Sequence, residues 1–213
     1  MKEQLTQALI AGNADLVNAL TQALLAAGTP AREILDDALL PGMEVVGARM
    51  RSGECFIPEV LLSARTMQGA LDILTPHLGE GEGAGLGTVV LGTVEGDLHD
   101  IGKNLVGMLL QGAGFAVVNL GTGVTAGQFV AAVRQHAPAI VGMSALLTTT
   151  LPHMAETLAA LKEAGLRDQV KVLVGGAPVT QAFADELGAD GYGANAGMAV
   201  DRARALVAQA TPA

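Results

Sequence analysis

The first 79 residues repeat their apolar side chains at helical intervals and contain no strand-like run. The clearest case is the segment 56–78, where apolar residues recur every three or four positions and form one stripe. These positions are Ile57, Val60, Leu61, Ala64, Leu71, Leu74 and Leu78. Gly12, Gly28 and Gly53 separate the helical segments from one another. The pattern therefore predicts a four-helix bundle over residues 1–79.

The pattern of apolar and polar residues changes after residues 80–87, a glycine-rich stretch that we expect to be a linker. Beyond it, short apolar runs typical of buried strands alternate with helical periodicity. The expected strands are 88–94, 115–120, 139–143, 170–174 and 191–192. The expected helices are about 100–111, a segment from about 125, one through Met154, Leu158 and Leu161, and a last one to about Ala208.

This alternation predicts an α/β fold with a doubly wound, five-stranded parallel sheet over residues 88–213. In such folds ligands bind at the carboxyl ends of the strands. We therefore expect the functional residues in the loops after the first, third and fourth strands.

Composition and charge narrow the function further. The 213 residues include 12 basic and 21 acidic side chains, a net charge of −9, and only 2% are aromatic. Such a surface repels phosphate backbones and offers few platforms for stacked bases, so nucleic acid is not an expected ligand. Cys55 is the single cysteine, which excludes an internal disulfide and a CxxC pair. The N-terminus lacks a signal-peptide core and no apolar run reaches about 18 residues, so we expect a cytoplasmic protein without membrane contact.

The loop after the first strand could be mistaken for a phosphate-binding loop. A Walker A loop has four residues between its glycines, followed by Lys and then Ser or Thr. Here five residues separate Gly96 from Gly102, and Asn104 stands where the magnesium-binding hydroxyl would be. The acidic side chains of Glu95 and Asp97 would also repel a triphosphate.

Asp97 and His99 lie two residues apart in the same loop, so both side chains can project to one side. A carboxylate beside an imidazole is the usual arrangement around a metal-ligating histidine, and it is also found around histidines that only cap a helix. The remaining histidines, His77, His136 and His153, have no ligand spacing to this loop. One histidine can still be the axial ligand of a metal whose other positions a macrocycle fills.

Residues Asp97–Gly102 match the Asp-x-His-x-x-Gly signature of cobalamin-binding domains. Ser144-Ala-Leu146 resembles the Ser-x-Leu motif of the same family, and Gly175–Gly176 resembles its diglycine. The segments 41–47 and 56–60 resemble the helical cap of methyl-transferring corrinoid proteins. The resemblance covers nearly the whole chain and extends to the cobalamin module of cobalamin-dependent methionine synthase. It implies a four-helix cap followed by a flavodoxin-like cobalamin-binding domain.

The resemblance also implies a role for individual residues. His99 would replace the benzimidazole of the cofactor as the lower cobalt ligand, with Asp97 hydrogen-bonded to it and Thr150 completing a relay. Ser144 and Thr148 would line the slot for the displaced nucleotide tail. The further implied cofactor contacts are Gly96, Leu98, Asp100, Ile101, Gly102, Leu146, Gly175, Gly176, Ala196, Phe56, Ile57 and Val60. After the second strand the chain departs from the family, with Gly121–Thr125 in place of an acidic residue and a proline.

Each motif also has a simpler interpretation. Ser144 could cap a helix, and Gly175–Gly176 could form an ordinary turn between a strand and a helix. Met43 and Met50 suit the core of the bundle, because methionine fills irregular gaps.

The resemblance implies a corrinoid protein that binds cobalamin as methylcob(III)alamin or cob(I)alamin and carries a methyl group. Its partners would be a donor-specific methyltransferase, an acceptor methyltransferase acting on a tetrahydropterin or a thiol, and a reductive activase. The helical half would act as a movable lid, with Phe56, Ile57 and Val60 nearest the methyl group. The alternatives are cobalamin storage or delivery, and the cobalamin subunit of a mutase.

Overall fold

The computed structural model describes residues 1–77 and 85–210. Most of the predicted linker 80–87, and Leu78 of the predicted stripe, lie outside these residues. The chain forms two compact units. The helical unit consists of Met1–Gly85 and Met108–Phe115, and the α/β unit consists of Leu86–Gly107 and Ala116–Ala213.

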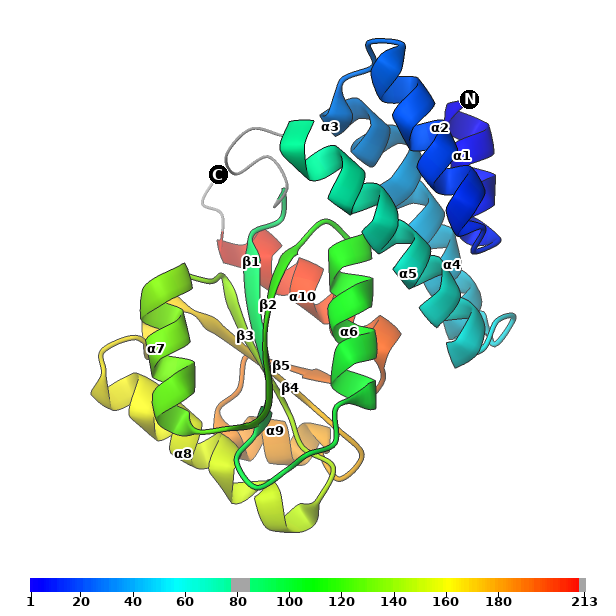
Figure 1. The fold of residues 1–213 in the computed structure, drawn as a ribbon. Coiled ribbons are helices and arrows are strands. Elements are labelled where there is room, and N and C mark those ends of the chain that lie inside the picture. Colours follow the sequence, from blue (N-terminus) through cyan, green and yellow to red (C-terminus); the bar gives the residue numbers. More distant parts are fainter. Residues whose placement is uncertain (78–84, 211–213) are drawn as a thin grey trace. The chain divides into compact units, whose positions relative to one another are not determined.

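Four helical segments make up the N-terminal part of the helical unit, as the sequence predicts (Figure 1). Three of its elements follow one another without a break and together form one of the four segments. The elements are α1 (Lys2–Ile10), α2 (Ala14–Ala26), α3 (Ala31–Ile34), η1 (Leu35–Leu39), α4 (Leu40–Ser52), α5 (Ile57–Leu74) and the single 3-10 turn η2 (Thr75–His77).

The π-helical turn η1 has its cause in Pro41, which lies in the first turn of α4. Proline has no N–H, and its ring crowds the carbonyl four residues earlier, so a regular α-helix cannot continue through it. A wider π turn relieves this crowding. Leu35, Ala38 and Leu39 stay buried, so the segment keeps its core face through the irregularity.

The buried face of α5 is more polar than the predicted stripe. Ile57 is exposed, whereas Ser63 and Thr66 are buried together with Val60. The two hydroxyl groups tolerate burial because they donate to main-chain carbonyls, Ser63 to Ile10 at 3.3 Å and Thr66 to Leu62 at 2.9 Å. The stripe is thus divided, with Val60 in the core of the bundle and Ile57 at the surface.

The α/β unit contains a five-stranded, all-parallel sheet, which confirms the predicted fold class. The spatial order is β2-β1-β3-β4-β5. The strands are β1 (Thr88–Val94), β2 (Ala116–Val124), β3 (Ile140–Ser144), β4 (Lys171–Gly175) and β5 (Gly191–Gly193). The chain runs from β1 to one neighbour, β2, and then returns to the other side of β1 as β3, so the strand order reverses between β1 and β3.

Helices cover both faces of this sheet, with α7 and α8 on one face and α6 and α10 on the other (Figure 1). On the first face Phe129, Met154 and Leu161 form a core cluster with Val90 and Val141. The helices and single turns are α6 (Ile101–Gly112), α7 (Ala126–His136), η3 (Thr148–Thr150), α8 (Pro152–Glu163), η4 (Arg167–Gln169), α9 (Gln181–Leu187) and α10 (Ala196–Ala210). Across residues 1–77 and 85–210, none of the helices has the length and apolar character needed to cross a bilayer.

Two elements differ from the sequence prediction. β2 continues to Val124, because bulges at Gly121 and Gly123, both with positive φ, keep it paired with β1 beyond the predicted end at residue 120. The segment Gly121–Thr125, expected as a loop, therefore belongs mostly to a strand. The helix α9 is missing from the prediction, although Thr180 caps its start and Gly188 ends it in the left-handed region.

Candidate functional site

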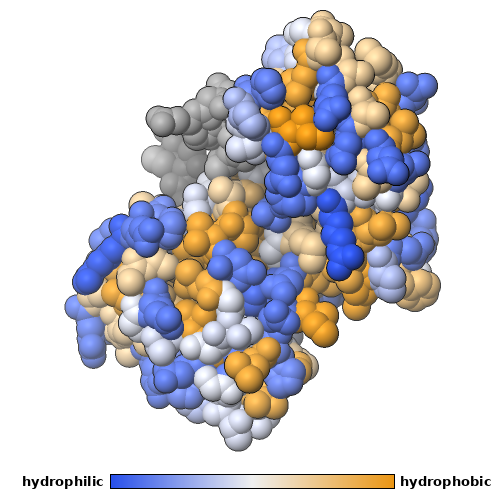
Figure 2. All heavy atoms as spheres, in the orientation of Figure 1, coloured by the Kyte–Doolittle hydropathy of each residue, from blue (hydrophilic) through white to orange (hydrophobic). Residues whose placement is uncertain are grey.

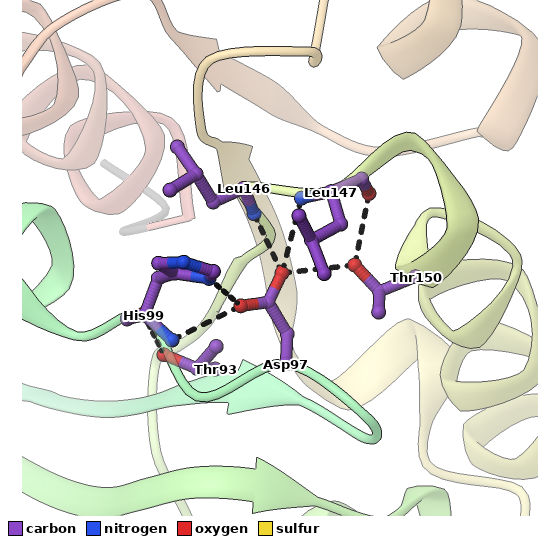
Figure 3. A network of polar contacts seen from close by, with 6 residues as sticks. All are labelled: Thr93, Asp97, His99, Leu146, Leu147 and Thr150. Carbon is purple, nitrogen blue, oxygen red and sulfur yellow. Dashed lines mark hydrogen bonds and ion pairs between the residues drawn. The ribbon is translucent and has the colours of Figure 1, made fainter.

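The candidate site lies where β1 and β3 end. These two strands flank the reversal of strand order, which is where ligands bind in open α/β sheets. The turn after β1 carries Asp97 and His99, and the turn after β3 carries Leu146, Leu147 and Thr150. Figure 3 shows these side chains and main-chain groups converging on the carboxylate of Asp97.

Asp97 is fully buried and accepts hydrogen bonds on both carboxylate oxygens. Oδ1 accepts from the main-chain N–H of His99 at 3.0 Å and lies 2.7 Å from His99 Nδ1. Oδ2 accepts from the N–H groups of Leu146 and Leu147 at 2.7 and 3.2 Å, and from the Thr150 hydroxyl at 2.9 Å. The carboxylate thus ties the turn after β1 to the turn after β3.

This environment keeps Asp97 ionised. Burial by itself raises the pKa of a carboxyl group. The hydrogen bonds from His99, Leu146 and Thr150 outweigh burial and hold the pKa of Asp97 well below its usual range. Because an ionised carboxylate only accepts hydrogen bonds, the neutral His99 ring must carry its proton on Nδ1.

His99 consequently presents its other nitrogen, Nε2, with a free lone pair. Its side chain is 52% exposed although its partner Asp97 is buried. The main chain of His99 is held as well, because the buried hydroxyl of Thr93 donates to its carbonyl at 3.0 Å. The result is an anchored, half-exposed imidazole whose Nε2 lone pair is left for a ligand.

Large apolar side chains lie beside His99 in the sequence and in the turn after β3, and they are exposed. Leu98 and Ile101 are 76% and 77% exposed, and Leu146 and Leu147 are also exposed. Figure 2 shows hydrophobic side chains gathered near the lower end of the view, where the strands of the α/β unit end in Figure 1. Exposed apolar side chains of this size beside a polar anchor indicate a ligand surface.

Gly102, in the first turn of α6, adds room to this surface. A Cβ there would meet nothing within 4 Å, and the backbone does not require glycine. One available nitrogen ligand, an apolar surface and open space beside it would suit a metal held in a large, flat macrocycle. The residues present therefore fit a corrinoid.

The diglycine has a packing role of its own. Gly176 has φ +129°, and a Cβ there would lie 1.8 Å from the carbonyl oxygen of Ala145. A Cβ at Gly175 would lie 3.0 Å from the carbonyl oxygen of Gly193. Glycine at 176 is therefore required by the close approach of the β3 and β4 turns, whatever passes along them.

The other predicted tail contacts lie at or shortly after the carboxyl ends of β3 and β5. Ser144 is the half-buried last residue of β3, and Thr148 is exposed in η3. Ala196 is buried and is itself the first residue of α10, whereas the sequence placed it before that helix. Their contact with a nucleotide tail stays a prediction.

The residues predicted from the helical half differ in exposure. Phe56 is 71% exposed and Ile57 is also exposed, whereas Val60 is completely buried. Met43 is buried, in agreement with its simpler interpretation as core. The expected roles of Phe56, Ile57 and Val60 near a methyl group stay predictions.

Three residues of the site were missed by sequence reasoning. Leu147 contributes a main-chain N–H, Thr93 anchors His99, and the Gly123 N–H donates to the Asp97 carbonyl at 3.0 Å. None of these has a signal in a single sequence. The burial of Lys103, four residues after His99, was also missed, although Lys103 shares a helical stripe with the buried residues Gly107 and Leu110.

Comparisons with known proteins agree over both units. A family described as B12 binding domain matches residues 87–201, and a second family with the same description matches residues 1–75. A corrinoid protein of Desulfitobacterium hafniense is 44% identical over 208 residues, which are 96% of either chain. The trimethylamine corrinoid protein of Methanosarcina barkeri is 43% identical over 195 residues, covering 91% of this chain and 90% of that protein. Among solved structures, the methanol:cobalamin methyltransferase complex of Methanosarcina barkeri matches with a TM-score of 0.88 and 35% identity, over 96% of this chain and 78% of the other.

Proposed function

We propose that this chain, which belongs to the B12-binding corrinoid proteins of methyltransferase systems, binds cobalamin through His99. It carries a methyl group between two partner enzymes. In this proposal the benzimidazole of the cofactor is displaced and His99 takes its place below the cobalt. The acceptor enzyme acts on a tetrahydropterin or a thiol, and a reductive activase restores the reduced cofactor.

The observation that carries the proposal is the pairing of an exposed imidazole with a buried carboxylate. Asp97 holds the proton on Nδ1 of His99, which leaves the lone pair on Nε2. Since Nδ1 is occupied, Nε2 is the nitrogen left for a metal. The exposed Leu98 and Ile101 supply apolar surface on either side of His99 in the chain.

The cobalt of the bound corrinoid supplies a centre that accepts a methyl group and gives it up again. The residues of this chain would hold and orient the histidine nitrogen that binds the metal. The Oδ2 atom of Asp97 is anchored by Leu146, Leu147 and Thr150, so the carboxylate keeps its place whether or not Nε2 is engaged. We therefore assign His99 to ligation, Asp97 to fixing the proton on Nδ1, and Thr150 to holding Asp97.

Electron paramagnetic resonance of the cobalt(II) form tests the ligation. The protein is loaded with hydroxocobalamin and reduced, once with ordinary histidine and once with ¹⁵N-labelled histidine. Labelling is expected to change the nitrogen splitting, because the coupled nitrogen belongs to histidine and not to the benzimidazole. His99→Ala is expected to lose this coupling.

His153→Ala is the matched control for this experiment. The His153 ring pairs with a carboxylate in the same way, with Nδ1 2.8 Å from Glu156 Oε2, and it is expected to leave the spectrum unchanged. A splitting that ignores the label, or that survives in His99→Ala, contradicts the assignment of His99.

Methyl transfer separates a carrier from a storage protein. The reduced, loaded protein is mixed with candidate donor methyltransferases and isotopically labelled donor, and methylation of the cofactor is followed by its absorption spectrum. The names of the relatives make trimethylamine and methanol the donors to test first. A carrier accepts the label and passes it to an acceptor enzyme, whereas a storage protein binds cobalamin and accepts no methyl group from any donor system.

A further inference from the structure

Lys103 is an unusual residue for its position, a lysine that is only 2% exposed in the first turn of α6. A buried ammonium is unfavourable unless oxygen atoms surround it. Burial lowers the pKa of Lys103, and the charge of nearby Asp100 opposes this shift. The burial of this charged side chain therefore calls for a structural or functional explanation. The ligation by His99 described above does not involve Lys103.

The ammonium joins two elements that lie on either side of it. Nζ donates to Asn104 Oδ1 at 2.6 Å, in its own helix, and to Asn119 Oδ1 at 2.7 Å, in β2. These short bonds from a charged donor are stronger than bonds between neutral groups. Lys103 thus ties the start of α6 to the middle of β2, just before its bulges.

The charge also decides how the two amides are oriented. An ammonium only donates, so both asparagines must turn their oxygens toward Lys103. The Asn104 amide nitrogen then donates to Asp100 Oδ2 at 2.9 Å, and the Asn119 amide nitrogen donates to Asn104 Oδ1 at 3.1 Å. Asn119 Oδ1 also accepts the N–H of Gly121 at 3.0 Å. One cation therefore orders a continuous polar chain from Asp100 to the bulged part of β2.

Both ends of this chain reach the loop that carries His99. Asp100 directly follows His99 in the sequence. Two residues after Gly121, the N–H of Gly123 donates to the main-chain carbonyl of Asp97 at 3.0 Å. The bulged end of β2 is thus bound to the loop before His99 through Asp97, and after His99 through Asp100.

We propose that Lys103 is a positioning residue of the cofactor site, whose buried ammonium clamps the bulged end of β2 against the Asp97–Asp100 loop and so fixes the place of His99. The inference rests on the proposed function in taking His99 as the lower ligand. It assigns to Asn104 and Asn119 the role of relaying the clamp. It also gives the bulged end of β2 a contact with the site, through the N–H of Gly123.

The test uses Lys103→Met, which keeps the length of the side chain and removes the charge with both hydrogen bonds. Asn119→Ala removes the other half of the clamp and serves if Lys103→Met does not fold. The matched control is Lys171→Met, which removes a lysine that pairs with Asp190 at 3.5 Å at the amino end of β4.

The first measurement is amide hydrogen exchange in the cofactor-free protein. Loss of the clamp is expected to speed exchange at Gly121 and Gly123 by about tenfold or more relative to core amides such as Val141. Lys171→Met is expected to leave this ratio unchanged. Exchange that rises equally at Val141 would show a general loss of stability, and it would overturn the inference.

The second measurement is the histidine-nitrogen coupling of the cobalt(II) form. Lys103→Met is expected to lose part of the coupled signal, whereas Lys171→Met retains it. A wild-type protein with coupling that Lys103→Met leaves intact overturns this inference alone. A wild-type protein without histidine coupling overturns the proposed function and this inference with it.

Discussion

Asp97→Asn separates the two tasks of the buried carboxylate, because asparagine keeps the shape but replaces one acceptor oxygen by a donor. In the wild-type protein Oδ1 faces two donors from His99. Oδ2 faces three donors, the N–H groups of Leu146 and Leu147 and the Thr150 hydroxyl. The substituted side chain must therefore turn its amide nitrogen toward one of these two groups.

The two orientations differ in free energy. If the amide nitrogen faces the turn after β3, the Thr150 hydroxyl can donate to the Leu147 carbonyl 2.9 Å away, but two main-chain N–H groups lose their acceptor. If it faces His99, one main-chain N–H loses its acceptor, and the ring can adapt by accepting at Nδ1. Each buried donor without an acceptor destabilises the protein by about 1–3 kcal/mol. We therefore expect the amide nitrogen to face His99.

This orientation moves the ring proton of His99 to Nε2 and removes the lone pair that would bind cobalt. Ligation then requires the less stable arrangement, which is disfavoured by about 1–3 kcal/mol. The expected weakening of ligation is roughly 10- to 100-fold, the usual range for partners of metal ligands. Total cobalamin binding should fall less, because the rest of the cofactor keeps its contacts.

The assay compares the histidine-coupled fraction of the cobalt(II) spectrum with the total amount of cobalamin bound. Glu156→Gln is the matched control, since it makes the same chemical change beside His153. Wild-type coupling and wild-type methyl transfer in Asp97→Asn would contradict the role assigned to Asp97 in fixing the His99 proton. Asp97 would then only stabilise its loop.

Three further outcomes follow from the same geometry. Thr150→Val removes one donor from Asp97 and leaves the two N–H groups. Chemical unfolding should show that the apoprotein is destabilised by about 1 kcal/mol. Resonance spectra should show that ligation is weakened less than in Asp97→Asn. Gly176→Ala drives a Cβ into the carbonyl of Ala145 and should lower the free energy of unfolding. The loss should exceed the roughly 1–2 kcal/mol expected for the control Gly165→Ala. Gly165 also has a positive φ, but the space around it is open. Finally, because the folded-state pKa of Asp97 is lowered, its contribution to stability is present above the unfolded pKa of about 4 and is lost as the pH falls below it. Unfolding curves between neutral and acid pH should therefore show a smaller loss in Asp97→Asn than in the wild type, and equal losses would contradict this.

The order of elements could be predicted from the sequence because it depends on local periodicity. The run Thr88–Val94 is mostly apolar and lies between Gly87 and Gly96, and it forms β1 with the predicted ends. The four helical segments of the N-terminal part follow the glycines that separate them. The helix α9 carries a capping threonine and a terminal glycine, so its absence from the prediction was a failure to use a local signal.

The length of β2 shows where local signals mislead. Gly121 and Gly123 normally indicate the end of a strand. Here the partner strand β1 decides the outcome, because pairing between Val94 and Val124 continues beyond the bulges. A sequence without its neighbours does not reveal such pairing.

The fold class, the order of the strands along the chain and the Asp97–His99 pair could be predicted from the sequence, because each depends on residues close in sequence. What anchors that pair depends on residues far apart in the chain, which only the folded protein brings together. Leu146 and Thr150 reach Asp97 across 49 and 53 residues, and Lys103 reaches Asn119 across 16. These contacts arise because parallel strands bring their carboxyl ends to one edge of the sheet, whatever the length of chain between them. The burial of Lys103 likewise depends on the tertiary structure, because one of the oxygen atoms that stabilise its charge comes from β2, which packs beside α6.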